Sequence, residues 1–465
     1  MLELAVFHNG AADLPLTTTH EGVVVNDGDL DEVHESGRRI IANQVRQGVL
    51  ADQLGFNYWF MTEHHFQPEG AELSPAPLQT ETAIAALTSR IRLGQMANIL
   101  PWWHPIRVAE SAAMLDVMSG GRLEFGVGRG YQPREAEVLG GAMGATIQDQ
   151  ERNRSYFEEA YEIIMKAWTE PSFSYHGEFY RVPPSYTKWN HKQTIAYFEQ
   201  ERTKHPVDEV LDLGPPDMYS MGSPVLASTT RLREISVIPQ PLQKPHPQVW
   251  QPVTSPRSID WAAERGINCF TVPEPTSRLI GNVQRYYEQC EAAGWPDRLD
   301  RGPFKFGWDS GQKRGYGCCR YVHLLDPNDP DVDLERFKLG LELQWDYYGP
   351  FGFAAVLADA DEDPYPLDMR VTADLLIDKQ VAIVGTPDQV VEQIMAVKEG
   401  VGYEDFLFTT WFEIGGYSHE EVEHQMQWFA SDCMPQLADA CGGMVVNPSA
   451  NAVAPDIAAA AAAGD

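Results

Sequence analysis

The sequence predicts a TIM (β/α)8 barrel with long insertions. Short apolar segments alternate with segments whose apolar residues recur at helical spacing. This alternation is typical of parallel strands joined by right-handed crossovers. Eight such strands can be identified, which is the number that closes a barrel. A doubly wound open sheet is the alternative, but no G-x-G-x-x-G motif opens a helix after the first strand.

The first half of the predicted barrel has four strands, at residues 2–8, 57–61, 91–100 and 122–127. Helices are expected after the first three, at residues 32–54, 77–89 and 106–118. Ile40, Val45 and Val49 have helical spacing in the first of them. Gly55 ends that helix, and Ser119-Gly120-Gly121 marks a turn after the third.

The second half repeats the pattern. Strands are expected at residues 248–253, 268–272, 315–325 and 403–412, and helices at residues 258–265, 277–293, 334–347 and 419–437. All eight strands belong to one predicted domain, residues 1–440.

Two insertions interrupt this domain. Residues 173–247 are aromatic, rich in proline and poor in helical pattern, and a loop of this length is usually a lid or disordered. Residues 351–376 are acidic, which is typical of solvated surface. The alanine-rich tail, residues 441–465, has low complexity and is expected to fray.

Composition limits the classes of function. The formal charge of -32 repels phosphate backbones and acidic lipid surfaces, which argues against nucleic-acid and membrane partners. No apolar run approaches the roughly 20 residues of a membrane span. The six cysteines include no C-x-x-C pair. A reduced, cytoplasmic protein is therefore expected.

Four segments follow strands of the predicted barrel, at the rim where barrels of this kind carry reactive groups. One of them holds Arg129 between Gly128 and Gly130, so that a guanidinium and free backbone N–H groups could bind a phosphate. Ser255 and Ser258 open a helix, where N–H groups favour an anion. A surface salt bridge and ordinary helix capping are the alternative interpretations.

His64, after the second strand, is a candidate general acid–base group. His65 beside it is interpreted as a buried, hydrogen-bonded ring. Neighbouring residues of an extended segment point in opposite directions, so the two histidines would not share a metal, and no metal site is predicted. His104 either lines the pocket or braces a turn. Met96, Ala97 and Asn98 could lie beside a planar ring or simply form a core strand. An aromatic substrate pocket could be built by Trp102, Trp103, Trp250 and Trp308, which are otherwise core residues, and His65 is a further pocket candidate.

Several segments in series resemble the bacterial luciferase-like flavin monooxygenases. They run between Leu2 and about Leu437 and read WFMTEHHF, LPWWHPIRVAE, LDVMSGGRLEFGVGRGY, PQPLQKPHPQVW, SPRSIDWAAERGI and VGTPDQVVEQI. The resemblance implies a TIM barrel that uses reduced FMN, supplied by a separate NAD(P)H:flavin reductase. It also implies that O2 adds at the flavin C4a carbon, that the peroxyflavin oxidises a small organic substrate, and that the protein is a homodimer.

The resemblance also implies roles for single residues. His64 matches the active-site histidine, which would manage a proton at the flavin peroxide. Arg129 matches the phosphate arginine, with a backbone N–H from Tyr131. The remaining phosphate loop matches Thr254, Ser255, Pro256 and Ser258, although luciferase has a carboxylate where this chain has Thr254. Met96-Ala97 matches a position that is often a cis peptide beneath the flavin ring. Val127 replaces the reactive cysteine of luciferase, which argues against light emission.

Two other functions fit the same barrel. One is an F420-dependent oxidoreductase that transfers a hydride without oxygen, and the other is a flavin-binding or partner subunit without catalysis. The sequence leaves the substrate open: epoxidation, Baeyer–Villiger insertion and aldehyde oxidation are all compatible with it.

Overall fold

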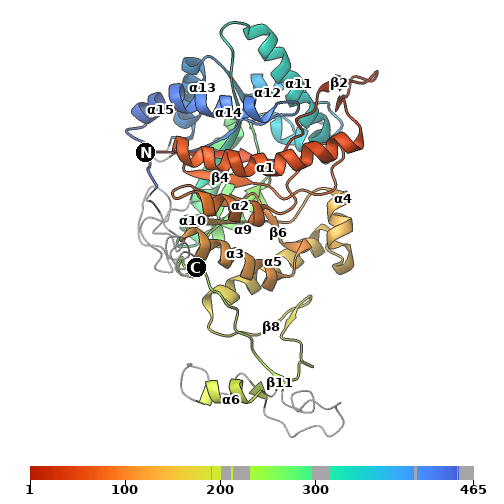
Figure 1. Ribbon diagram of the computed structural model, residues 1–465, viewed down its shortest axis with the longest axis vertical. Coiled ribbons are helices and arrows are strands. Elements are labelled where there is room, and N and C mark those ends of the chain that lie inside the picture. Colours follow the sequence, from red (N-terminus) through yellow and green to blue (C-terminus); the bar gives the residue numbers. More distant parts are fainter. Residues whose placement is uncertain are drawn as a thin grey trace, which may run out of the picture. The chain divides into compact units, whose positions relative to one another are not determined.

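The computed structural model describes residues 1–189, 191–199, 211–212, 231–295, 315–402, 406–447 and 449. The chain divides into two compact units, whose elements are labelled in Figure 1. Unit 1 consists of Met1–Ile99, Leu115–Glu135 and Leu242–Asp465, and unit 2 consists of Leu100–Met114 and Ala136–Pro241.

Unit 1 contains the predicted barrel. Each strand pairs in parallel with the next, and the last pairs with the first, so the barrel closes. The strands, in order around the barrel, are β1 (Leu2–His8), β4 (Tyr58–Met61), β5 (Arg92–Gln95), β7 (Leu123–Gly128), β12 (Gln248–Val253), β13 (Asn268–Thr271), β14 (Tyr316–Leu324) and β16 (Phe406–Trp411). All eight predicted strands are confirmed, although residues 403–405 of the last prediction lie outside the described residues.

Aromatic side chains fill the barrel. Phe60 on β4 contacts Phe270 on β13, with ring centroids 5.5 Å apart, and Phe7 on β1 contacts the same ring at 5.6 Å. These strands are not neighbours in the sheet, so the rings meet inside it. Trp250 packs against Phe60 at 5.4 Å and donates its indole N–H to Glu124. The interior is therefore a packed core, as in other barrels of this class.

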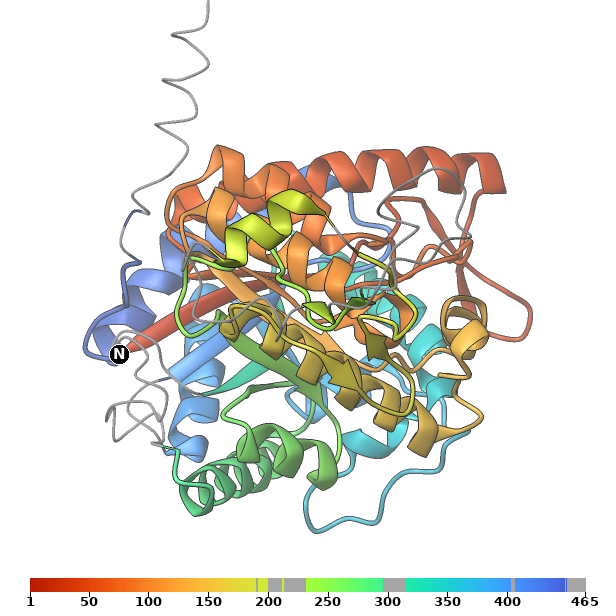
Figure 2. The ribbon, with the colours of Figure 1, turned by 90° about the horizontal axis from the view of Figure 1, so that it is seen from below.

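Predicted helices flank the strands of unit 1, and their ends follow local capping rules. Helix α1 (Leu30–Leu54) begins with a capping box between Asp29 and Glu32 and ends at Gly55, whose φ of 91° favours glycine. Figure 2 shows α1, in red, beside α2 (Pro77–Leu87), in orange. Pro256 opens α9 (Pro256–Glu264), and α10 (Thr276–Ala292) packs against α9.

The helix that follows β14 in the sequence is not the helix that packs beside α10. The predicted helix at residues 334–347 exists as α11 (Pro330–Tyr348), but α11 packs against the hairpin of β2 (Leu16–Thr18) and β3 (Val24–Asn26). Helix α13 (Pro387–Val401) contacts α10 and the additional strand β15 (Ala382–Gly385), which pairs with β14. The helix that packs beside α10 is therefore α13, which the sequence analysis did not predict.

Two other predicted elements are interrupted. The helix predicted at residues 419–437 consists of α14 (His419–Trp428), a π-helical turn at Phe429–Cys433 and α15 (Met434–Ala440). The strand predicted at residues 91–100 consists of β5 and β6 (Asn98–Ile99), with Met96 and Ala97 between them.

Unit 2 contains most of α3 (Pro105–Ser119) and the unpredicted helix α5 (Gln150–Thr169). Where the first insertion is described, it forms short hairpins, β8 (Tyr175–His176) with β9 (Arg181–Val182) and β10 (Leu211–Asp212) with β11 (Arg231–Leu232), and helix α6 (Lys192–Glu199). Among the described helices, none is both long enough and apolar enough to cross a membrane.

The second insertion lies in unit 1. It begins with short 3-10 turns, continues as an irregular segment and ends in α12 (Ala373–Asp378). Two of its acidic residues, Asp359 and Glu362, form ion pairs with Lys379, and the Ser277 hydroxyl donates to Asp359. These contacts attach the acidic segment to the end of α12 and to the start of α10.

The interruption between β5 and β6 is a bulge against β7. Leu93 pairs with Leu123, whereas Asn98 pairs with Val127, so five steps along one strand match four along the other. The Met96–Ala97 peptide bond in this bulge is cis. Gly126 faces the bulge so closely that a Cβ atom there would lie 1.4 Å from the Gln95 carbonyl oxygen. Only glycine fits at position 126.

We therefore expect Gly126→Ala to lower the free energy of unfolding by more than about 4 kcal/mol, or to prevent folding, because the backbone of β5 would have to move. Thermal unfolding of the purified variant measures this effect. Gly281→Ala is the control, since Gly281 lies in α10, where a Cβ atom would have no neighbour within 4 Å, and alanine favours a helix. Equal stability of the two variants would contradict the close approach at Gly126.

Candidate active site

The site is built at the carboxyl ends of four neighbouring strands of unit 1, β4, β5, β7 and β12. Met61 at the end of β4 pairs with Gln95 at the end of β5, so the segment that carries His64 starts level with the bulge. Trp250 pairs with Gly126, and three further steps set Val253 level with Arg129. The register thus brings the predicted His64, Met96–Ala97, Arg129 and Ser255 segments to one rim of the barrel.

Arg129 follows β7 directly and is half-buried, as is Gly130, whose φ of 75° favours glycine. On the next strand Ser255 caps α9: its hydroxyl accepts a hydrogen bond from the Ser258 backbone N–H at 3.3 Å and lies 3.0 Å from the Ser258 hydroxyl. Thr254 and Pro256 are exposed. A half-buried guanidinium beside a helix N-terminus with two hydroxyls is a composition that suits a phosphate monoester.

Side-chain hydrogen bonds hold the backbone of the bulge between β5 and β6 in place. The Asn98 side-chain amide donates to the Gly126 carbonyl at 2.9 Å and to the Gln95 side-chain oxygen at 2.8 Å. The Gln95 side-chain amide in turn donates to Glu81 of α2. Burial raises the pKa of Glu81 well above its usual value, although the bond from Gln95 lowers it. Asn98, predicted to lie at the cofactor, therefore holds the backbone of the bulge.

His64 lies between two carboxylates. Its Nε2 is 3.3 Å from Glu72 Oε1, and its Nδ1 is 3.3 Å from Glu135 Oε1. Both glutamates are buried, Glu72 at 2% exposure and Glu135 fully. Gln67 and Gln132 join them: the Gln67 amide donates to Glu72 at 3.0 Å, and the Gln132 amide lies 3.3 Å from His64 Nδ1. The histidine belongs to a buried polar network.

The charges of this network change the protonation of His64. Burial alone would lower the pKa of the imidazole, but the negative charges of Glu72, Glu135 and Glu63 outweigh it and raise the pKa to about 9. At neutral pH His64 is therefore protonated, and in this state it can act as a general acid but not as a general base.

Aromatic residues from α11 and from the turns after it pack against the segment that follows β7. Tyr131 contacts Phe351 and Phe353 edge-on, at 5.5 and 5.0 Å, and also contacts the His64 ring at 5.7 Å. The Tyr347 hydroxyl donates to Gln132 at 2.7 Å. Tyr131, Tyr347, Phe351 and Phe353 are all half-buried. The second insertion thus begins beside Tyr131, which in turn contacts His64.

The sequence analysis missed the carboxylates and amides around His64, namely Gln67, Glu72, Gln132 and Glu135, and Tyr347 of α11. One signal for them existed. Gln67 and Glu72 follow the second strand, and Gln132 and Glu135 follow the fourth, so both pairs lie on segments that the barrel places at the reactive rim. No motif distinguishes them from ordinary surface residues.

The other predicted residues lie in different places. His65 is half-buried rather than buried, and its Nε2 is 3.3 Å from Glu63, away from the partners of His64. Trp250 lies within the barrel core. Trp103 and His104 belong to unit 2, where both are exposed and His104 Nδ1 accepts the Ile106 N–H at 3.3 Å. Trp308 lies outside the described residues.

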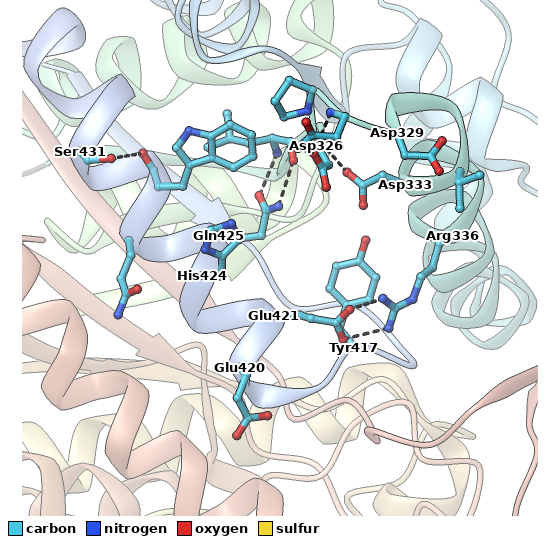
Figure 3. Close-up of a pocket in the computed structure, with 16 residues that line it drawn as sticks. Asp326, Asp329, Asp333, Arg336, Tyr417, Glu420, Glu421, His424, Gln425 and Ser431 are labelled. Atoms are coloured by element: carbon cyan, nitrogen blue, oxygen red, sulfur yellow. Dashed lines mark hydrogen bonds and ion pairs between the residues drawn. The ribbon is translucent and has the colours of Figure 1, made fainter.

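A separate cleft lies between α11 and α14, and Figure 3 shows its lining. None of the predicted site residues lines it. Its polar groups pair largely with one another: Arg336 with Glu421, Asp333 with His323, and the Gln425 side chain with the backbone of Leu324. The first pair joins α11 to α14, the second joins α11 to β14, and the third joins α14 to β14.

The protonation of His64 predicts a pH dependence of stability. An ordinary histidine has a pKa near 6.5, so raising it to about 9 contributes stability that is complete below pH 6.5 and is lost as the pH rises through 9. The loss is on the order of 3 kcal/mol, or a few degrees in Tm for a chain of this length. Thermal unfolding between pH 6 and 9.5 should show a steeper decline for the wild-type protein than for His64→Gln. Parallel curves would contradict the imidazolium.

The chain is similar to several known proteins. Residues 23–208 match the family model for luciferase-like monooxygenases. Two uncharacterized proteins of Sinorhizobium fredii are similar, y4vJ with 34% identity over 33% of this chain and y4wF with 30% over 56%. The chain spans only 41% and 59% of their lengths.

A third relative is the oxygenase component of the flavin-dependent trigonelline monooxygenase of Acinetobacter baylyi, 22% identical over 84% of this chain and 88% of that protein. Among solved structures, the oxygenating constituent of 3,6-diketocamphane monooxygenase of Pseudomonas putida, in complex with FMN, has a TM-score of 0.59 at 18% identity, covering 86% of this chain and 94% of the other. At this identity the structural likeness establishes the barrel fold.

Proposed function

We propose that the chain is a luciferase-like monooxygenase and, within that class, the oxygenase component of a two-component enzyme that uses reduced FMN and O2. The match of residues 23–208 to the family model and the similarity to a named oxygenase component support this proposal. The observation that carries this proposal is the convergence of four segments on one rim of unit 1. Arg129, the start of α9, the Met96–Ala97 bulge and His64 follow four neighbouring strands, and these are the parts that a phosphate, a flat ring and a proton transfer need.

The phosphate would be held by Arg129, by the Ser255 and Ser258 hydroxyls and by the backbone N–H groups of Tyr131 and the first turn of α9. Arg129 is half-buried and flanked by glycines, so a phosphate can approach the backbone without meeting a side chain. The dipole of α9 adds a favourable charge at the same place. Thr254, where a carboxylate would repel the anion, is neutral.

The flavin ring would lie at the bulge, against Met96 and Ala97, with its reacting edge toward His64. Reduced FMN, when bound, would supply the electrons that activate O2. The chain's own contribution is to orient the ring and to hold a proton on His64. Tyr131, Phe351 and Phe353 would exclude water and bound the substrate pocket.

The substrate would be a small organic molecule. One relative is named for trigonelline and a structural neighbour for a diketocamphane, so a test set should include an N-methylpyridinium carboxylate, a bicyclic ketone and a long-chain aldehyde. The name of the first relative as an oxygenase component supports a separate NAD(P)H:flavin reductase as the source of reduced FMN. A homodimer is part of the same proposal.

The test has two steps. Reduced FMN and reduced F420 are titrated separately into the protein without oxygen, and then O2 and each test compound are added and oxygenated products are measured by mass spectrometry with labelled O2. We expect saturable binding of reduced FMN and incorporation of one labelled oxygen atom into a product. Binding of F420 alone, with oxygen-independent oxidation of an alcohol, would contradict the proposal and favour the hydride-transfer alternative.

A further inference from the structure

Glu72 and Glu135 contact opposite nitrogens of His64, but their surroundings differ. Glu72 has four other donors: Asn9 at 2.8 Å and Tyr131 at 3.1 Å to Oε1, and Gln67 at 3.0 Å and Gln132 at 2.5 Å to Oε2. It therefore keeps a full set of hydrogen bonds without His64. The Nε2 contact, at 3.3 Å, is the one that this carboxylate can release at little cost.

Glu135 is hydrogen-bonded to the segment that carries His64, the residue that we argue it orients. Its Oε1 accepts the backbone N–H of His65 at 2.5 Å, and the same atom lies 3.3 Å from His64 Nδ1. Glu135 is fully buried, and its Oε2 has no hydrogen-bond partner within the described residues. Its Oε1 is bonded to the backbone next to His64, so this carboxylate is anchored to the segment that carries the imidazole. This is the arrangement of a carboxylate that fixes an imidazole through Nδ1.

We propose that Glu135 and Glu72 are positioning residues for His64: Glu135 fixes the ring through Nδ1, and Glu72 faces Nε2, whose proton is the one that the site can release. The inference rests on the proposed function for what receives this proton. The carboxylate–imidazole arrangement itself stands on the distances alone.

The groups that face the His64 ring come from three segments. Glu63 and Glu72 lie on the segment after β4, and Tyr131, Gln132 and Glu135 lie on the segment after β7. Tyr348 of α11 is hydrogen-bonded to Glu72 and accepts from Asn9 at 2.7 Å. The largest charge effects on the ring come from the carboxylates of Glu72, Glu135 and Glu63. The field at His64 is therefore set by carboxylates, which favour its cationic form.

The role agrees with the overall reaction. Reduced FMN, O2 and substrate give FMN, oxygenated substrate and water, which neither consumes nor releases a net proton. His64 would lend its Nε2 proton to the oxygen atom that leaves as water. It would regain a proton from the N–H that the flavin loses when it returns to the oxidised state. Glu72 and Glu135 would hold the ring in place between the two transfers.

The test compares Glu135→Gln and Glu72→Gln with Glu69→Gln. Both network variants keep the shape and remove one charge, whereas Glu69 is on the same segment but exposed and paired with Arg134. In the protein without cofactor, the imidazole signal of His64 is followed by NMR from pH 5 to 10 and assigned by its absence in His64→Gln. We expect a midpoint near pH 9 in the wild type and in Glu69→Gln. We expect each network variant to titrate at least one pH unit lower, a tenfold change in the dissociation constant.

The second readout is the pH profile of product formation with reduced FMN and O2. The alkaline limb should move to lower pH in both network variants, by the same amount as the NMR midpoint, while the Kd for reduced FMN stays within threefold of the wild type. Unchanged midpoints in both variants would overturn the inference, whether or not the protein is a monooxygenase. Shifted midpoints in a protein that fails to bind reduced FMN would overturn the proposed function and leave the carboxylate–imidazole arrangement standing.

Discussion

Replacing Arg129 with alanine is expected to weaken the binding of reduced FMN by roughly 10- to 150-fold. This corresponds to the loss of a hydrogen-bonded charge pair, worth about 1.5–3 kcal/mol. The effect should be specific to the phosphate, so riboflavin, which lacks it, should bind the wild type and the variant with similar affinity. Anaerobic titration followed by flavin absorbance or protein fluorescence measures both ligands.

The control for this prediction is Arg38→Ala. Arg38 lies on the exposed face of α1 and pairs with Glu35. The variant therefore removes one positive charge, as Arg129→Ala does, but at a position that belongs to none of the four rim segments. It should bind reduced FMN as the wild type does. If Arg129→Ala and Arg38→Ala changed the affinity equally, the effect would come from the net charge of the protein, and Arg129 would not be the phosphate ligand.

Replacing His64 with alanine is expected to lower the rate of substrate oxygenation by roughly 10²- to 10⁴-fold, the usual contribution of a positioned acid. The variant also leaves Glu72 and Glu135 without the cation between them, so water and protons should enter the network. The fraction of reduced FMN that yields hydrogen peroxide should therefore rise at the expense of product. Product and peroxide are measured together, with the first compound that the wild type oxygenates.

His64→Ala should leave the affinity for reduced FMN nearly unchanged, because the proposed phosphate ligands lie after β7 and at the start of α9 rather than on the segment after β4. A rate within threefold of the wild type would show that another group supplies the proton. His65 is the obvious candidate in that case, since its ring is half-buried and pairs with Glu63.

The strands were predictable because a parallel barrel buries both faces of every strand. The resulting continuous apolar runs, such as Leu2–His8, stand out from the rest of the chain. Helix α13 was predictable as well: Thr386 and Gln389 form a capping box, Pro387 opens the helix and Gly402 ends it. It was missed because α11, after the same strand, already supplied a helix. When two helices follow one barrel strand, periodicity alone does not show which of them is inserted and which belongs to the barrel repeat.

The candidate site was only partly predictable for a different reason. Arg129 and His64 belong to motifs with local signals, glycine neighbours and a family match. Glu72, Glu135 and Tyr347 act through their position in space, and Tyr347 reaches Gln132 across 215 positions of the chain. Such contacts depend on how the loops close over the barrel. The pairing that sets the protonation of His64 therefore requires the structure, because the sequence shows only scattered glutamates.

The most direct test of the central claim is a crystal structure of the protein with FMN. The account predicts the phosphate within hydrogen-bond distance of Arg129 and of the first turn of α9, and the flavin ring against the Met96–Ala97 bulge with its reacting edge toward His64. An FMN phosphate bound elsewhere, for example at Arg336 in the cleft between α11 and α14, would contradict it.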